Sequence, residues 1–523
     1  MKSSDKFLRG AMILTIAGLL VKVIGSVNRI LLSRLLGGEG IGLYQMAYPV
    51  YLLLLSISAA GIPVAISIIV AEYLAQRDYA NVRQVFRVSL RLMGVVGLVL
   101  AAALVMAAGW LVENGVIKDA RAYYALLALT PAIFFATILA SFRGYFQGHQ
   151  LMTPPAVSQI VEQFIRVVTM VVLAYVLLPY GLEYAAAGAA FGAVPGSLTG
   201  LVVLGGFYRY YKKQWRDEES ALPGAQLTPA RRLIKRLLLL ALPVSCANVI
   251  VPVTSSIDVL LVPKYLLAAG FSVKEATTQF GYLAGMAQPL LLMATIPTMS
   301  LATSLVPAVS EAMALKRWAL IEEKLATAMK LCCLITVPAA VGMSALAGPI
   351  SRLLYGTGEA AAAIMHSGPA IWFLGLQQVT TGMLQGMGHT NLPMLHMLAG
   401  IVAKLIAVCQ LTNAEYGIAG AAWATNINFG VTAALNILAL QYFKIKFHWL
   451  SICKIIFAAL IMGAAAQALH GLLAGFNYTL ATLAALAGAG VVYAALLPLL
   501  RIISVAELKQ LPLVKKLAQK LRK

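Results

Sequence analysis

Charged residues are scarce in this chain, and acidic residues are the scarcest of them. Only 11% of the 523 residues are charged, with 19 Asp and Glu against 40 Lys and Arg. Soluble globular domains carry about 25% charged residues. Together with 61% hydrophobic residues and a mean hydropathy of +0.85, this scarcity excludes a soluble enzyme and a disordered protein. We therefore expect an integral membrane protein.

Cysteine, histidine and catalytic motifs are also sparse. The five cysteines lie in or beside apolar runs, are odd in number and show no metal-ligand spacing, which argues against a disulfide framework. The six histidines are scattered, and no GxSxG, P-loop or HExxH motif occurs. These absences predict a protein that is not an enzyme, holds no metal or other cofactor and does not use ATP directly.

Fourteen apolar runs have the length of membrane-spanning helices, which need about 20 residues. Transmembrane strands would be shorter and would alternate. The expected fold class is therefore all-α integral membrane with about 14 transmembrane helices. The runs cover residues 10–32, 43–71, 88–112, 122–142, 155–178, 184–208, 237–262, 280–309, 328–350, 361–386, 393–411, 418–441, 451–474 and 479–501.

Basic residues fall on one side of these predicted spans. Lys and Arg gather in the N-terminus, in segments 72–91, 209–236, 310–330 and 442–454, and in the tail, while the alternate loops are short and poor in them. This pattern orients membrane proteins and is not that of a nucleic-acid-binding surface. It predicts both termini on the cytoplasmic side, with an uncleaved first span.

The chain also repeats itself at an offset of about 240 residues. Met46-Ala47-Tyr48-Pro49 matches Met286-Ala287-Gln288-Pro289, and three further matches keep the same order. Six spans per copy predict two parallel repeats around a central site, an architecture that works by alternating access. The predicted parts are a six-helix lobe (1–208), a basic linker (209–236), a second six-helix lobe (237–441), two extra helices (442–503) and a basic tail (504–523).

Polar residues share one face in each of two predicted spans. Lys22 and Arg29 lie on one face of the first span, and the fifth span carries Gln159, Glu162, Gln163 and Arg166 at intervals of three and four. Ionisable groups inside a bilayer are energetically costly and usually have a function, so both faces are expected to line a cavity. Glu162 and Arg166 are expected to form an i, i+4 ion pair. Arg29 could instead snorkel to the interface, and the pair could be purely structural.

The charges in this first lobe leave an excess of +2, which attracts anions. Arginine gives phosphate two-pronged contacts, so phosphate or pyrophosphate fits the expected cavity. The second lobe differs, because its copy of the fifth span keeps only one residue of the polar face, Lys404. Asp258 with Asn426 and Thr425 is instead expected to bind a coupling ion, Na⁺ or H⁺, unless Asp258 lies at the membrane interface.

Several segments carry a family resemblance. They are KVIGSVNR at 22–29, GEGIGLY at 38–44, GIPVAIS at 61–67, RGYFQG at 143–148, Ser158-Gln159 with Glu162-Gln163 and Arg166, and YGLEYA at 180–185. The sequence resembles the stage V sporulation protein B family of the multidrug/oligosaccharidyl-lipid/polysaccharide flippase superfamily. That resemblance implies two six-helix lobes with two extra helices, and it adds Asn28 to the expected substrate-binding residues.

The resemblance further implies a flippase for a polyprenyl-pyrophosphate-linked saccharide, the peptidoglycan precursor lipid II, in spore cortex synthesis. It implies the cytoplasmic membrane as the location, a lipid-linked glycan and the bilayer as partners, and the peptidoglycan synthesis machinery as a further partner. The alternative is a multidrug or organic-cation antiporter of the same superfamily, which would need an acidic cavity. An enzyme in the outer loops and a scaffold without transport are weaker alternatives.

Overall fold

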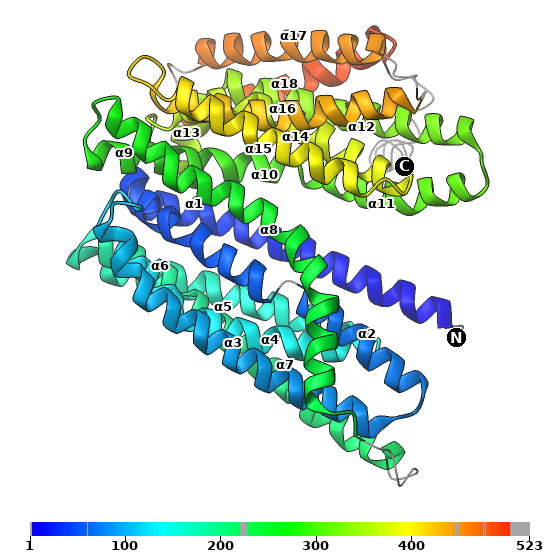
Figure 1. The fold of residues 1–523 in the computed structure, drawn as a ribbon. Helices are drawn as coiled ribbons and strands as arrows, with labels where there is room; N and C mark the ends of the chain where they lie inside the picture. Colours follow the sequence, from blue (N-terminus) through cyan, green and yellow to red (C-terminus); the bar gives the residue numbers. More distant parts are fainter. Residues whose placement is uncertain are drawn as a thin grey trace, which may run out of the picture. The chain divides into compact units, whose positions relative to one another are not determined.

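The computed structural model describes residues 3–59, 61–219, 227–443, 445, 449–473, 475 and 477–502. The predicted tail 504–523 and part of the predicted linker lie outside them. The described residues form helices and connecting turns without a strand, which confirms the all-α fold class (Figure 1). The chain divides into two compact units, Met1–Gly285 and Met286–Lys523.

The first unit is built from ten helical elements. They are α1 (Ser3–Ser58), α2 (Ile62–Ala75), α3 (Tyr79–Glu113), α4 (Ala122–Gly148), α5 (Thr153–Leu177), the short η1 (Leu178–Tyr180), α6 (Leu182–Phe191), α7 (Ala193–Glu219), α8 (Ala230–Ala268) and α9 (Val273–Phe280). The π-helical η2 (Gly281–Ala287) crosses the boundary between the units. The second unit contains α10 (Gln288–Ala294), α11 (Ile296–Ala314), α12 (Trp318–Ala345), α13 (Ala347–Tyr355), α14 (Ala361–Gly386), α15 (Asn391–Leu411), α16 (Gly417–Tyr442), α17 (Trp449–Leu473) and α18 (Tyr478–Leu499).

Helix α1 consists of two arms that turn toward each other at Gly37. Gly37 has φ 65° and ψ −173°, a conformation that favours glycine. Residues 3–36 form the first arm and residues 38–58 the second. The Arg29 guanidinium lies 5.9 Å from the centre of the Tyr48 ring, whereas 19 residues of straight helix would rise about 28 Å. In Figure 1 the dark-blue chain accordingly runs from the N-terminus and then turns back.

The second arm crosses α9 and η2 through small residues. A Cβ atom on Gly42 would lie 2.2 Å from the Thr277 carbonyl oxygen, and one on Gly281 would lie 1.9 Å from that of Gly38. Small residues spaced by four let membrane helices approach this closely. In the predicted repeat, whose offset is about 240 residues, Gly38 corresponds to Thr277 and Gly42 corresponds to Gly281. The contacts therefore join two segments that the repeat relates to each other.

The boundary between the units differs from the lobe boundary predicted at residue 237. Helix α8, assigned to the second lobe from the sequence, packs against α1 and α2 within the first unit. The backbone N–H of Gly61 donates to the Ser245 hydroxyl at 3.1 Å, and a Cβ atom on Gly61 would lie 2.1 Å from the Ala241 carbonyl oxygen. This contact depends on a glycine in the chain that precedes α2. The division into two six-helix repeats stays a prediction.

The described residues contain nine helices that are long and apolar enough to cross a membrane. The bent pair Val273–Ala294 and Ile296–Ala314, at 47°, would make ten. The predicted count of fourteen is compatible with this result but is not confirmed by it. Helices α14 and α16 have 26 residues each and carry Gln, Asn and Thr side chains, and they are not among the nine.

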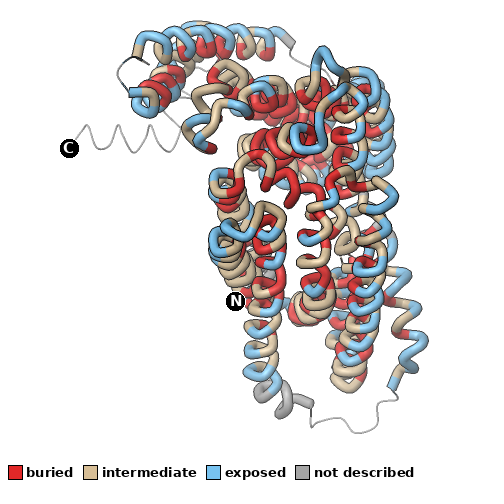
Figure 2. The backbone as a smooth tube through the Cα atoms, turned by 90° about the vertical axis from the view of Figure 1, so that its left-hand side faces the viewer, coloured by how far each residue is buried: buried red, intermediate tan, exposed pale blue. Residues whose placement is uncertain are grey.

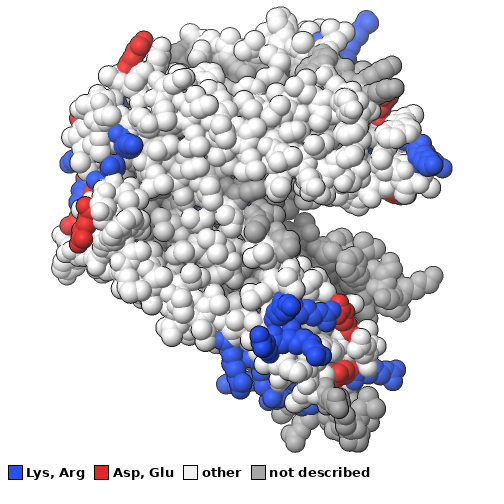
Figure 3. All heavy atoms as spheres, viewed as in Figure 1, with Lys and Arg blue, Asp and Glu red and all other residues white. Residues whose placement is uncertain are grey.

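The surface of the helices suits a bilayer. Large apolar side chains are exposed on them, for example Met106 at 74% and Leu239 at 64%. In Figure 2, single helices carry both buried and exposed residues. In Figure 3, most of the visible surface is uncharged, and the Lys and Arg side chains gather in a few clusters. Lipid is the medium in which such apolar exposure is stable. The chain is therefore a multi-pass membrane protein.

Candidate functional site

The polar faces of the first arm and of α5 meet inside the first unit. A Cβ atom on Gly25 would lie 3.2 Å from the side-chain nitrogen of Gln163, and the Asn28 amide donates to the Met170 sulfur at 3.3 Å. Asn28 is 4% exposed, and its Oδ1 atom is buried without a hydrogen-bond partner among the residues that the structure describes. Small and polar residues on the first arm therefore bring it against the predicted polar face of α5.

Three tyrosines on the second arm complete this region. Tyr44, Tyr48 and Tyr51 are spaced by four and three, so they share one helix face. The Tyr44 and Tyr48 rings stack with centres 5.3 Å apart, and Tyr48 lies 5.9 Å from Tyr51. Arg29 sits over the Tyr48 ring in a cation–π contact. The sequence interpretation missed these tyrosines, although their helical spacing was a usable signal.

Arg166 is bound to the second arm. Its Nη2 atom donates to the Tyr51 hydroxyl at 3.2 Å, and Tyr51 is 2% exposed. The Nε atom of Arg166 is buried without a hydrogen-bond partner among the described residues. Behind it, a Cβ atom on Gly196 of α7 would lie 2.9 Å from the Arg166 Cβ. The glycine allows α7 to press Arg166 toward the tyrosines.

The predicted ion pair between Glu162 and Arg166 is wrong, because Glu162 has a different partner. The Glu162 carboxylate instead accepts from Arg143 of α4, with Oε2 and Nη2 2.6 Å apart. The two side chains are 15% and 20% exposed, so the pair is largely shielded from solvent. Helices α4 and α5 both pack against α7, where a Cβ atom on Gly200 would lie 3.4 Å from Oε2 of Glu162. Arg143, which is not among the substrate-binding residues expected from the sequence, thereby joins the site.

The resulting cationic cluster consists of Arg29, Arg143, Arg166 and Glu162 beside Tyr48 and Tyr51. The cluster contains three guanidinium groups and one carboxylate, of which only Arg143 is paired with Glu162, and this leaves an excess of two positive charges. The Nε atoms of Arg143 and Arg166 are both buried without a partner in the described chain. Buried donors of this kind demand an acceptor, and an anionic ligand would supply one.

Two further predicted residues lie along the same faces. Lys22 is exposed on the first arm, about two helical turns before Arg29. Gln159 is half-buried on α5, one turn before Glu162 and Gln163. Both could reach a ligand larger than a phosphate that extends from the cationic cluster along the helices.

The predicted ion-coupling residues belong to different units. Asp258 is 4% exposed on α8 in the first unit. Asn426 lies on α16 in the second unit and donates to the His366 carbonyl at 2.8 Å, and its buried Oδ1 has no hydrogen-bond partner in the described part of the chain. Thr425 donates to the Ala421 carbonyl of its own helix at 3.3 Å. A shared ion site of Asp258, Asn426 and Thr425 stays a prediction.

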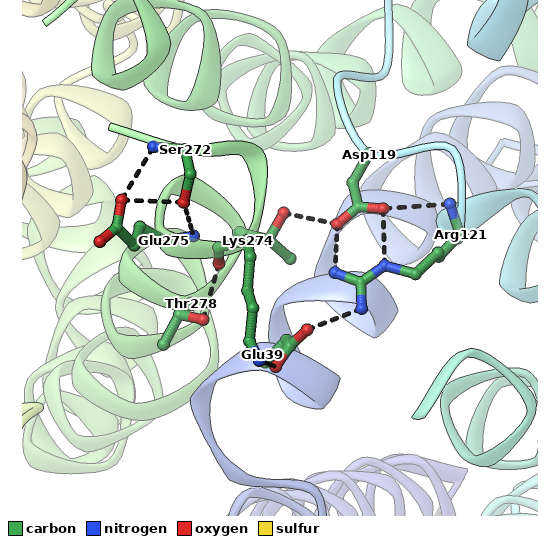
Figure 4. A network of polar contacts seen from close by, with 8 residues as sticks. Glu39, Asp119, Arg121, Ser272, Lys274, Glu275 and Thr278 are labelled. Atoms are coloured by element: carbon green, nitrogen blue, oxygen red, sulfur yellow. Dashed lines mark hydrogen bonds and ion pairs between the residues drawn. The ribbon is translucent and has the colours of Figure 1, made fainter. Parts of the chain in front are cut away.

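A second polar network joins three segments at one end of the first unit (Figure 4). Arg121 contacts both Asp119 and Glu39, with nitrogen–oxygen distances of 2.8 and 2.6 Å, and Asp119 also accepts from the Thr277 hydroxyl at 2.8 Å. Lys274 lies 3.6 Å from Glu39. Burial raises the pKa of Asp119, but the bonds from Arg121 and Thr277 outweigh it and hold the pKa below its usual range. The network fastens the bend of α1 to α9 and to the turn before α4.

Comparisons with known proteins agree with this fold. The model of the polysaccharide biosynthesis protein family matches residues 7–313, and the MatE model matches residues 283–408. The stage V sporulation protein B of Bacillus subtilis (strain 168) is 32% identical and covers 98% of this chain and 99% of its own length. The lipid II flippase MurJ of the same organism is 26% identical, with 77% of each chain covered.

Solved structures show the same architecture. The lipid II flippase MurJ in an inward closed conformation aligns with a TM-score of 0.70 at 14% identity, over 93% of this chain and 98% of that one. An inward-facing multidrug resistance MATE transporter aligns with a TM-score of 0.64 at 16% identity, over 81% and 94%. The curated relatives include a lipid II flippase, and the chain is not an enzyme. The resemblance drawn from the sequence motifs is confirmed. The chain belongs to the family of polysaccharide biosynthesis proteins.

Proposed function

We propose that this protein moves a polyprenyl-pyrophosphate-linked saccharide across the cytoplasmic membrane by alternating access. The observation that carries the proposal is the cationic cluster, which places three arginines and one glutamate inside a membrane unit. Charges in this position are costly and are retained for function. An anionic headgroup that must cross a bilayer needs such a site.

The chemistry of the cluster fits a pyrophosphate. Guanidinium groups bind phosphate oxygens through paired, charge-assisted hydrogen bonds. Arg29 and Arg166 would hold the pyrophosphate, while the tyrosines keep both guanidinium groups in place. Glu162 would orient Arg143, its partner in the structure, and Gln159 and Gln163 would bond the sugar. Lys22 and Asn28 would extend the binding surface along the first arm.

The relatives support lipid II, the peptidoglycan precursor, as the substrate. One relative is named lipid II flippase and another stage V sporulation protein B, which also supports a role in spore cortex synthesis. On this proposal the termini lie in the cytoplasm, as the basic segments predict, and the peptidoglycan synthesis machinery is a partner. An ion gradient or the membrane potential would drive transfer.

The second candidate is a multidrug or organic-cation antiporter. The match of the MatE model to residues 283–408 favours it. The cationic cluster opposes it, because a pathway with an excess of positive charge repels organic cations. The two candidates therefore differ in the sign of the charge that the transported molecule carries.

Transfer of a fluorescent lipid II between leaflets of proteoliposomes tests the proposal. Wild type should transfer it, while Arg29→Gln and Arg166→Gln should transfer it far more slowly although both variants remain folded. Arg87→Gln is the matched control, since Arg87 is exposed on α3 outside the cluster. Absence of transfer by wild type under any imposed potential, Na⁺ gradient or pH gradient would exclude lipid II as the substrate. Uptake of an organic cation by the same vesicles would favour the antiporter.

A further inference from the structure

The second unit contains a hydrogen-bonded network that joins α14, α15 and α16. His396 of α15 and Asn436 of α16 lie with Nδ1 and Oδ1 2.7 Å apart. The Nδ2 atom of Asn436 is 3.1 Å from the hydroxyls of both Thr380 and Thr381 on α14. Asn436 and Thr380 are fully buried, and His396 is half-buried. We call these four residues the histidine network.

The bonds of the histidine network fix where its protons lie. The single hydroxyl proton of Thr380 is donated to the Leu376 carbonyl at 2.7 Å, so the Thr380 oxygen can only accept from Asn436. The Asn436 amide nitrogen therefore faces Thr380, and its oxygen faces His396. Because that oxygen has no proton to give, the Nδ1 atom of His396 must carry one.

This arrangement leaves one basic atom on His396. In the neutral ring with a proton on Nδ1, the Nε2 atom holds the lone pair that can accept another proton. A proton taken up there leaves the bond from Nδ1 to Asn436 intact. The imidazole can thus become charged and neutral again without breaking the histidine network.

The other histidine of these helices has the opposite arrangement. The Trp423 indole N–H donates to Nδ1 of His366 at 3.2 Å, so this atom must be the acceptor. Protonation of His366 at Nδ1 would destroy that bond. Proton uptake is therefore compatible with the structure at His396 and disruptive at His366.

The surroundings of the histidine network favour a proton over a metal ion. Helix α15 packs against α16 and α14, and these three helices contain no Asp or Glu. Their ionisable side chains are His366, His396, Lys404, Cys409 and Tyr442. Lys404 is 2% exposed on α15, two turns from His396, and a lysine side chain offers no acceptor atom to a metal ion when it is protonated. The Asn436 oxygen, the best ligand for Na⁺, is already used by His396.

We propose that His396 binds and releases the proton whose movement drives transport, with Nε2 as the site of protonation. Histidines inside membrane helices serve as proton relays in pumps and transporters. The inference rests on the proposed function, because it assigns the driving ion of that transport cycle. It assigns the coupling site to residues of the second unit, whereas the cationic cluster belongs to the first.

Lipid transfer under a pH gradient tests the proposal. Proteoliposomes with fluorescent lipid II receive a pH gradient of either sign in turn. Wild type should accelerate with one sign of the gradient, and His396→Gln should lose this acceleration. Glutamine can still donate to Asn436 but has no basic nitrogen. His389→Gln is the control, because His389 stacks on Phe443 at 4.4 Å outside the histidine network and should respond like wild type. Acceleration that survives in His396→Gln would overturn the proposal.

A spectroscopic titration tests the site without any transport. The chain has six histidines, so ¹⁵N-histidine labelling gives few signals, and His396→Gln identifies the one from His396. That signal should show a proton on Nδ1 at alkaline pH and a second proton on Nε2 after acidification. A proton on Nε2 alone at alkaline pH, or no change on acidification, would refute the assignment. If wild type transfers no lipid, the proposed function fails, and this titration still decides whether His396 takes up a proton.

Discussion

Glu162 of α5 forms its ion pair with Arg143 of α4, at 2.6 Å, although Arg166 stands one turn away on its own helix. Arg166 instead contacts the second arm, where its Nη2 atom donates to the Tyr51 hydroxyl at 3.2 Å. The single carboxylate neutralises the arginine at the edge of α4, and two guanidinium groups remain beside the tyrosines. The geometry of this one pair thus decides where the positive charge of the cluster lies.

Replacement of Glu162 by glutamine should destabilise the protein. The change leaves the shielded Arg143 guanidinium without its counter-charge, which costs about 1–3 kcal/mol in a partly buried setting. Thermal unfolding in detergent measures the effect. Glu113→Gln, at an exposed carboxylate near the end of α3, is the control and should unfold like wild type. Equal midpoints for Glu162→Gln and Glu113→Gln would show that the pair contributes nothing to stability.

Loss of the Tyr51 hydroxyl should weaken transfer. Tyr51→Phe removes the oxygen that accepts from Arg166, and one such bond contributes about 0.5–1.5 kcal/mol, which corresponds to a roughly 2- to 12-fold change. Tyr48→Phe is the matched comparison, because the ring that faces Arg29 is kept. Initial transfer rates against lipid concentration should show the larger effect for Tyr51→Phe. The reverse order would place the important contact at Arg29.

The crossing at Gly42 should not tolerate any side chain. Gly42→Ala would place a Cβ atom 2.2 Å from the Thr277 carbonyl oxygen, and overpacking of this kind costs about 1–3 kcal/mol. Gly18→Ala, on the first arm with no atom within 4 Å of its Cβ position, should be neutral or slightly stabilising. The midpoint of thermal unfolding distinguishes the two variants. A Gly42→Ala protein as stable as Gly18→Ala would contradict the close crossing.

Much of this arrangement follows from the sequence, and the remainder depends on tertiary contacts. Hydropathy and the three-four spacing of Gln159, Glu162 and Arg166 predict a helix with one polar face, and the structure turns that face toward the first arm. Spacing does not say which neighbouring helix supplies a partner, so Arg143 was missed. The approach of Tyr48 to Arg29 depends on the bend at Gly37, which no helical periodicity reveals.

Acid should weaken the network around Asp119. The pKa of this carboxyl in the folded protein lies below its unfolded value of about 3.9, so its contribution is complete above that value. It is lost as the pH falls through the folded pKa. Thermal unfolding between about pH 3 and 7 should therefore show a drop at the acid end. Asp119→Asn should be less stable at neutral pH and should show a smaller drop. An unchanged acid dependence in this variant would assign the drop to other carboxyls.

The most direct measurement is the binding of farnesyl pyrophosphate, a short polyprenyl pyrophosphate, to purified protein by calorimetry. Wild type and Arg87→Gln should bind it equally. The double variant Arg29→Gln/Arg166→Gln should bind about 10- to 100-fold more weakly, because two charge-assisted contacts are lost. Equal binding by the double variant and wild type would contradict the assignment of the cationic cluster as the pyrophosphate site.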